Sequence, residues 1–511
     1  MNAKNSRCMS KLRYISLLCL LLCSLSLAAQ TFEDVSRRSF WQESRNVAGL
    51  RQDSLSVSFA EIYGLYESGD FRNTWDAAWK WSAGASTASV LHFERMSLTG
   101  AFSFDQTEGY DMCGSMFVEP GYFPMDVLEF TPGRKTLQTY AFNGGMAYEL
   151  GSSWVLGARI DFESSNLAKR KDLRYTDWRL DLSVAPSLTY SSGNWTLGFS
   201  PVFRKVSETI GAQQIGTSES SYYAFLDKGL MYGIRQVWTG SGVHLEEAGV
   251  NGLPLREYSY GAAFQLGRRG LYADMEFMRT AGVAGEKEYI WFEFPGMEMA
   301  AGLRYRLSQG GRDHHFALKF DWKRQDMDEN VLEKVTVNGI TDVLNHGSNR
   351  IFSRAMWSLA PSYEFVSQKV EVLASMGLER FAGLSSQMYP YVNTLSETSV
   401  SASLSGLFRV GAFDLKADIS VMKGFYDESS VKTGCGEVLT EPYRLQDWYD
   451  RQMEYMSALK TGLGASLRYN FDNGIYLEAS GKWLHGYGLE FLDGKDRFAA
   501  GLTLGYNFKR Y

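Results

Sequence analysis

The chain has 511 residues, of which 14% are aromatic and only 10 are prolines, and its formal net charge is −6. This mild negative charge excludes an extended nucleic-acid-binding surface, so we expect no nucleic-acid partner. The shortage of proline and the abundance of aromatic residues favour long β-strands joined by tight turns.

The N-terminus has the layout of a secretory signal peptide. Four basic residues between Lys4 and Arg13 precede a short apolar run from Ile15 to Leu27, and two alanines then offer a cleavage site. We therefore predict a signal peptide over residues 1–29. Only Cys113 and Cys435 remain after cleavage. An oxidising compartment would allow these two cysteines to pair, but the sequence does not show whether they are close.

Downstream, apolar residues alternate with polar ones over long stretches. Between Trp178 and Tyr190 every second residue is apolar or aromatic, whereas Arg179, Asp181 and Ser183 fall between them. This period of two places the two sets on opposite faces of a strand. The run suits a tilted membrane-crossing strand, which needs about 9 to 11 residues. No segment after the signal peptide approaches the roughly 18 apolar residues of a transmembrane helix.

The alternating segments come in pairs joined by tight turns. Seven hairpins turn at residues 151–153, 192–194, 267–270, 310–311, 367–368, 411–412 and 472–474. The other connections are longer and span roughly residues 163–177, 204–256, 280–295, 324–352, 380–397 and 424–458. Alternating short and long connections are typical of an outer-membrane barrel, with short periplasmic turns and long external loops.

Counting the segments predicts the size of the barrel. Fifteen strands follow Thr136, and one strand before an external loop at Asp105–Lys135 makes sixteen. Leu55–Tyr66 and Trp75–Ala83 would add a hairpin and make eighteen. An even number keeps both termini in the periplasm. We predict an all-β protein, a transmembrane antiparallel β-barrel of about 16–18 strands.

The barrel is expected to occupy residues 54–511 and to lie in the cell outer membrane. Residues 30–53 are expected to form an N-terminal periplasmic segment, without a plug domain before Leu55. The last strand, Phe498–Phe508, ends in aromatic residues as do segments read by the barrel-assembly machinery, which is an expected partner during biogenesis. The other expected partners are outer-membrane lipids and lipopolysaccharide, whose phosphates could meet Lys169–Lys171.

Residues opposite the apolar stripes are expected to face the barrel lumen. They carry charges of both signs, which allows two interpretations. A wide wet pore would keep these charges hydrated, whereas a closed lumen would pair them. The candidate lumen-facing residues are Arg159, Asp161, Arg179, Asp181, Arg304, Arg306, Lys319, Asp321, Lys323, Arg409, Lys416, Asp418, Arg468, Glu478 and Lys482.

The longest connection, residues 204–256, is the best candidate for a lid or constriction of the lumen. It holds His244, Glu246 and Glu247, which could form an acid–base or metal cluster but lack a paired nucleophile and a regular ligand spacing. We therefore expect no catalytic residue, metal ion or cofactor. A short amphipathic helix is expected around residues 443–459.

Six short segments in the predicted external loops carry a resemblance. They are Gly114–Phe117, Leu128–Gly133, Lys169–Arg174, Phe225–Gly229, Gly240–Glu247 and Gly285–Lys287. On these segments the chain resembles an uncharacterised outer-membrane β-barrel domain family of Gram-negative bacteria, over most of the mature chain. The resemblance implies location and fold, and it transfers no activity and no functional residue.

Three functions remain open at this point. The first is a channel or accessory protein for uptake of a small hydrophilic solute, with a possible surface uptake partner. The second is a closed barrel that serves as a surface interaction or assembly partner through its external loops. The third is a surface hydrolase, for which the sequence lacks a catalytic constellation.

Overall fold

The computed structural model describes residues 38–508 except residues 54–55, 172–173, 213–221, 232, 239–243, 246–249, 252, 287–288, 339, 389–390 and 431–444. The expected signal peptide, residues 1–29, lies outside the described residues. Among the helices described, none is long and apolar enough to cross a membrane.

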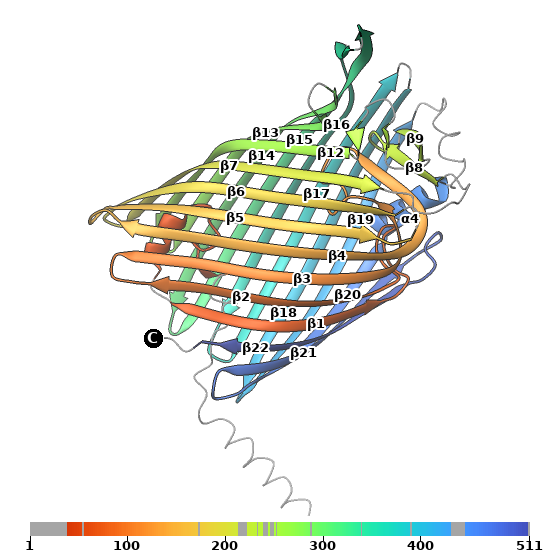
Figure 1. The fold of residues 1–511 in the computed structure, drawn as a ribbon. Helices are drawn as coiled ribbons and strands as arrows, with labels where there is room; N and C mark the ends of the chain where they lie inside the picture. Colours follow the sequence, from red (N-terminus) through yellow and green to blue (C-terminus); the bar gives the residue numbers. More distant parts are fainter. Residues whose placement is uncertain are drawn as a thin grey trace, which may run out of the picture.

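Eighteen antiparallel strands form a closed barrel, which confirms the predicted fold class at the upper end of the predicted range (Figure 1). Each strand pairs with the next one along the chain, and β22 closes the barrel by pairing with β1. The strands are β1 Val57–Ser68, β2 Trp79–His92, β3 Met96–Ser115, β4 Asp126–Glu149, β5 Trp154–Lys169, β6 Tyr175–Ser192, β7 Trp195–Ala212, β12 Leu253–Arg268, β13 Leu271–Glu286, β14 Tyr289–Gln309, β15 Arg312–Val337, β16 Ile340–Val366, β17 Val370–Met388, β18 Tyr391–Val410, β19 Phe413–Ser430, β20 Leu459–Asn470, β21 Ile475–Tyr487 and β22 Asp496–Asn507.

A few further elements are not strands of this ring. They are the 3-10 helix η1 Val47–Gln52, strands β8 Tyr222–Asp227 and β9 Gly233–Trp238, the short strands β10 His244–Leu245 and β11 Val250–Asn251, and helix α4 Leu445–Ser457. Strands β8 to β11 belong to the connection between β7 and β12, which pair directly with each other in the barrel. Helix α4 confirms the amphipathic helix predicted from the sequence.

The outer surface of the barrel is apolar, as the alternation predicted. Side chains of the apolar stripes, such as Leu156, Phe264 and Leu404, are about half exposed, at 49%, 51% and 50%. A contiguous apolar surface of this kind marks contact with lipid. Exposed aromatic residues gather near both rims, as in the girdles of outer-membrane barrels: Trp154, Tyr190, Trp195, Phe413 and Tyr469 near the short turns, and Tyr66, Trp79, Trp178 and Tyr487 near the other rim.

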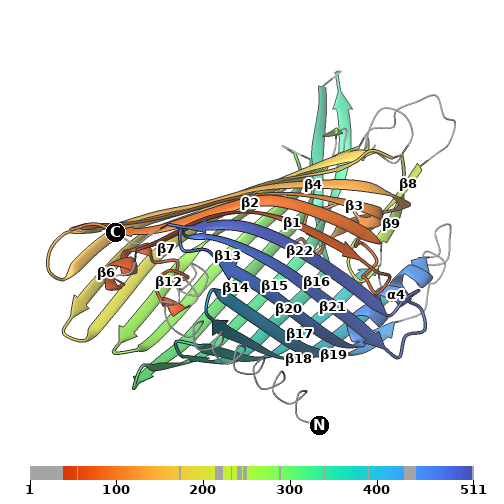
Figure 2. The same cartoon turned by 90° about the horizontal axis from the view of Figure 1, so that it is seen from below.

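The two ends of the barrel differ. The short turns lie at the end where the strand ladder closes between Phe59 and Asn507, so this end carries both ends of the barrel chain and is the periplasmic end. Helix α4 lies at the opposite, external end (Figure 2). The protein is an integral β-barrel of the outer membrane.

Several predicted external loops are strands instead. The connections expected at residues 163–177, 280–295, 324–352 and 380–397 are almost entirely strand in the structure. Apolar and polar side chains alternate only where one face of a strand contacts lipid. Backbone hydrogen bonds do not need lipid, so a hairpin can extend beyond the membrane into water. The sequence therefore showed the lipid-facing part of each strand and missed its external extension.

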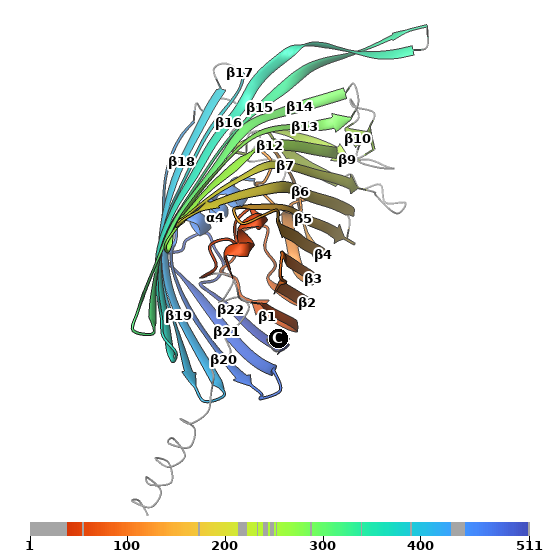
Figure 3. The ribbon, with the colours of Figure 1, turned by 90° about the vertical axis from the view of Figure 1, so that its left-hand side faces the viewer.

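The β15–β16 hairpin extends farthest from the rim (Figures 1 and 3). Strand β14 pairs with β15 only as far as Glu329, and β17 pairs with β16 only from Phe352. Within the described residues, the strand segments 330–337 and 340–351 therefore have backbone pairing only with each other. We call this free two-stranded part the external ribbon.

Candidate functional site

Residues 38–53, which precede β1, coil inside the ring of strands at the periplasmic end (Figure 3). We call them the inner segment. The side chain of Asn46 is fully buried and donates to a backbone carbonyl of β6 at 3.1 Å and to Oε1 of Gln265 at 2.9 Å. Arg51 pairs with Glu149 at 2.5 Å and donates to backbone carbonyls of the β2–β3 turn. Hydrogen bonds therefore fix this segment to several parts of the wall.

Apolar contacts also seat the inner segment. Val47 is 2% exposed and fits against two wall glycines: a Cβ added at Gly145 or Gly157 would lie 2.7 or 2.8 Å from its methyl groups. The ring of Trp41 meets that of Tyr272 edge-on, with centroids 5.1 Å apart. The sequence analysis placed this segment in the periplasm. Its apolar side chains are the physical reason that its described part lies inside the barrel instead, because there they leave water.

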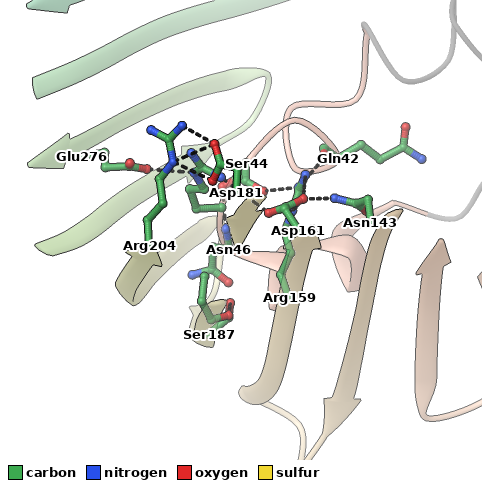
Figure 4. A network of polar contacts seen from close by, with 12 residues as sticks. Gln42, Ser44, Asn46, Asn143, Arg159, Asp161, Asp181, Ser187, Arg204 and Glu276 are labelled. Atoms are coloured by element: carbon green, nitrogen blue, oxygen red, sulfur yellow. Dashed lines mark hydrogen bonds and ion pairs between the residues drawn. The ribbon is translucent and has the colours of Figure 1, made fainter. Parts of the chain in front are cut away.

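Charged side chains of the inner segment join different strands of the wall, within the polar network that includes Asp161 and Glu276 (Figure 4). Arg45 contacts Asp161 on β5 at 3.5 Å and Glu276 on β13 at 3.2 Å. Glu43 pairs with Arg304 and lies 3.4 Å from Lys319. Because these side chains are only partly buried, each ion pair is worth little by itself, about 0–1 kcal/mol, and is weakened by salt.

At the external end, the connection between β3 and β4, residues 116–125, packs inside the ring against β5–β7 and β12–β16. The hydroxyl of Tyr122 donates to Glu257 at 2.6 Å, and Arg354 donates to the carbonyl oxygens of Gly121 and Tyr122 at 2.8 and 2.6 Å. Burial, with the neighbouring Glu257 carboxylate, raises the pKa of Tyr122 well above its usual range, so its hydroxyl remains a donor. Apolar side chains of this connection share one buried core with the inward faces of β5–β7 and β12–β16.

Two more elements, β8 and α4, pack near this connection at the external end. Strand β8 pairs with the start of β4, which places Phe225 opposite Leu128. On α4, the ring of Trp448 packs edge-on against Phe130, with centroids 6.1 Å apart. Residues 116–125, β8 and α4 together are called the outer cap below.

A chamber of about 910 Å³ lies between the inner segment and the outer cap. Its walls include Arg45 of the inner segment, Met125 and Trp448 of the outer cap, and inward residues of β13 to β19. A second cavity of about 790 Å³ lies beside the inner segment, against β1 to β7. Arg45 lines both cavities, so this one side chain stands between the chamber and the space behind it.

Several residues predicted to face the lumen contact the inner segment. Arg159 donates to the backbone carbonyl of Ser44 at 3.0 Å and also pairs with Asp161 at 3.0 Å. Arg304 and Lys319 pair with Glu43, as described above. Arg409 binds Glu371 at 2.5 Å, and the same carboxylate binds an arginine of the inner segment, Arg38.

The remaining predicted residues lie elsewhere on the wall. Arg179 binds Glu119 of the outer cap, and Asp321 lines the chamber. Others pair along the wall: Asp181 with Arg204, Lys323 with Glu298, Arg306 with Asp313, and Arg468 with Glu478. Lys416 and Lys482 are exposed, and Asp418 is half-buried.

The predicted loop cluster lies mostly outside the described residues. His244 lies on β10, and Glu246 and Glu247 lie outside the described residues. Cys113 is a free thiol, and Cys435 lies outside the described residues. In the described part of the chain, no group of three or more His, Cys, Asp or Glu residues is placed to bind a metal ion.

Sequence reasoning missed the residues of the inner segment, above all Glu43, Arg45 and Asn46. The composition of residues 38–53 could have indicated a packed segment. They combine aromatic, apolar and charged side chains, which is unusual for a flexible linker. Tyr122 was missed because it lies in a predicted loop, where no alternation marks an inward residue.

Comparison with known proteins finds a family and a set of similar folds. A family model described as "Family of unknown function (DUF6850)" matches residues 47–508. No curated protein sequence matches the chain. The FrpB iron transporter of Neisseria meningitidis is similar over 90% of this chain and 83% of its own, with 9% identity and a TM-score of 0.43. BauA, the ferric preacinetobactin receptor of Acinetobacter baumannii, covers 89% and 80% at 8% identity and a TM-score of 0.39. The matched family region includes η1 together with the barrel.

Proposed function

This chain belongs to the family of unknown function DUF6850, and on that premise we propose that it takes up a small solute through a gated lumen, with the inner segment as the gate. The observation that carries the proposal is the position of the inner segment. It lies inside the lumen at the periplasmic end, next to a chamber large enough for a small molecule.

The contacts of the inner segment suit a segment that undocks from the barrel wall and docks again. It is held by hydrogen bonds, partly exposed ion pairs and a few apolar side chains, and its sequence is contiguous, so it can withdraw as one piece. The outer cap is held differently, because buried hydrogen bonds join residues 116–125 to a large apolar core. Of the two closures, the inner one is therefore the easier to open.

The test compares the full chain with a variant that lacks residues 38–53, each inserted in a planar bilayer. The full chain should be silent or nearly silent, and the deletion should give stable conductance steps. A variant that lacks a similar length of the external ribbon, residues 333–348, is the matched control and should stay silent. A deletion variant that is folded but silent would contradict the gate.

A second function is favoured by the external ribbon: docking of a surface partner. Both edges of the ribbon have backbone groups open for pairing, and Val331 and Leu344 are 47% and 45% exposed. Open strand edges accept a strand from another protein. Removal of the ribbon would abolish capture of such a partner and leave conductance of the gate-deletion variant unchanged, so the two functions can be separated.

A further inference from the structure

The lining of the chamber is richer in sulfur and aromatic rings than a path for sugars requires. Seven methionines line it from the inward face and from the external side, besides Met299 of the outward stripe. Met278, Met356 and Met422 lie on strands, Met125, Met453 and Met456 lie in the outer cap, and Met231 follows β8. Unbranched thioether side chains adapt to apolar ligands of irregular shape.

Aromatic side chains occupy the same walls. Trp75, Trp448 and Tyr449 line the chamber near the outer cap, and Phe381 lines it from β17. All four are half-buried, so part of each ring faces open space. Their faces carry partial negative charge and attract a cation that lies over them.

Two exposed carboxylates face the chamber. Asp321 and Glu379 are exposed, and each accepts one serine hydroxyl at 3.4 Å. Within the part of the chain that the structure describes, neither carboxylate forms an ion pair. Of the cations beside them, Lys323 pairs with Glu298 at 2.8 Å, and Arg380 donates to the hydroxyl of Ser396 at 3.0 Å.

We propose that the chamber binds an amphipathic cation, with its apolar body among the methionines and aromatic rings and its positive group toward Asp321 and Glu379. This inference rests on the proposed uptake function and narrows its solute class. The sequence had favoured a small hydrophilic solute because only the charged positions of the wall could be read from it. The apolar character comes from the outer cap and from methionines whose inward direction the structure fixes.

The test uses two probes of the same shape and opposite charge, tetraphenylphosphonium and tetraphenylborate, with raffinose as a neutral hydrophilic probe. Binding is measured by equilibrium dialysis against the full chain in lipid nanodiscs, and binding to empty nanodiscs is subtracted. We expect saturable binding of the phosphonium, at least about tenfold tighter than that of the borate, and none of raffinose.

Variants locate the binding in the chamber. Asp321→Asn with Glu379→Gln should weaken phosphonium binding about tenfold, since both changes keep shape and remove charge. Glu333→Gln, on the external ribbon, removes a carboxylate far from the chamber and should change nothing. Met356→Gln should weaken binding of both probes. Equal or tighter binding of the borate, binding of raffinose, or an unaffected double variant would overturn the proposal.

The two proposals fail in different ways. If removal of the inner segment gives conductance but phosphonium does not bind, the gate stands and the solute class is wrong. If phosphonium binds in the chamber but the deletion stays silent, the chamber is a binding site and the gate is wrong.

Discussion

The contact between Val47 and Gly145 provides the most direct test of the proposed gate. A Cβ added at Gly145 would lie 2.7 Å from Cγ2 of Val47 and 2.9 Å from Cγ2 of Thr99, closer than side-chain carbons approach each other. Overpacking of this kind costs about 1–3 kcal/mol. If the inner segment takes up the strain by leaving its seat, Gly145→Ala should raise the undocked fraction roughly 5- to 150-fold.

The assay needs a reporter that reads undocking directly. Ala48 is fully buried beside Val47, so a cysteine introduced there (Ala48→Cys, with Cys113 and Cys435 changed to serine) reacts with a maleimide only when the segment undocks. The labelling rate then follows the undocked fraction. Gly145→Ala should raise this rate while the barrel still shows heat-modifiable migration in gels.

A second substitution separates the seat from the wall. Val47→Ala removes the atom that clashes, at a cost of about 1.6 kcal/mol for the lost burial of two methyl groups. The double variant should be labelled no faster than Val47→Ala alone, because the Cβ added at Gly145 then no longer meets Cγ2 of Val47. The effects of the two changes on the labelling rate should therefore not be additive. Strain against Thr99 belongs to the wall and should lower only the thermal midpoint of the barrel. Unchanged labelling in Gly145→Ala, or fully additive effects in the double variant, would refute the reasoning.

Three further outcomes are expected. Asn46→Ala should raise the labelling rate about 5- to 150-fold, because it leaves the buried Oε1 of Gln265 without this donor at a cost of about 1–3 kcal/mol. The control Gln52→Ala loses one exposed hydrogen bond and should change the rate little. Equal effects of the two variants would contradict this. Raising NaCl from 0.1 to 1 M should increase labelling several-fold, because the Debye length falls from about 10 to about 3 Å, and Arg45→Gln should reduce that salt response; a salt-independent rate would contradict the role of ion pairs. Replacement of residues 331–350 by a two-residue turn should leave the thermal midpoint of the barrel nearly unchanged, because within the described residues the ribbon backbone pairs only with itself and the ion pairs of Arg350 with Asp326 and Asp328 are exposed; a large drop would show that it supports the barrel.

The barrel itself was within reach of the sequence because lipid imposes a simple rule. Every second residue of a lipid-facing strand must be apolar, and Leu156 or Leu404 satisfies it whatever its distant neighbours are. The seven tight turns and the amphipathic helix were also local features. The external extensions of the strands were missed because the rule ends where lipid ends.

The candidate site was only partly predictable. Charged residues such as Arg159 and Asp161 could be assigned to the inward face, since they alternate with the stripe. Their partners could not, because Arg45 pairs with Asp161 across 116 positions of sequence and with Glu276 across 231. Nothing in the local sequence states that a segment before the first strand turns back into the barrel.

The sequence alone predicts a β-barrel with a lipid-facing outer surface and a charged inner one, because alternation is a property of neighbouring residues. The tertiary structure was needed to show that the inner segment lies inside the ring and that a methionine- and aromatic-lined chamber lies between it and the outer cap. This arrangement depends on contacts between residues far apart in the chain, such as Val47 with Gly145 or Tyr122 with Glu257. Such contacts depend on the closed ring of strands, which brings these residues together.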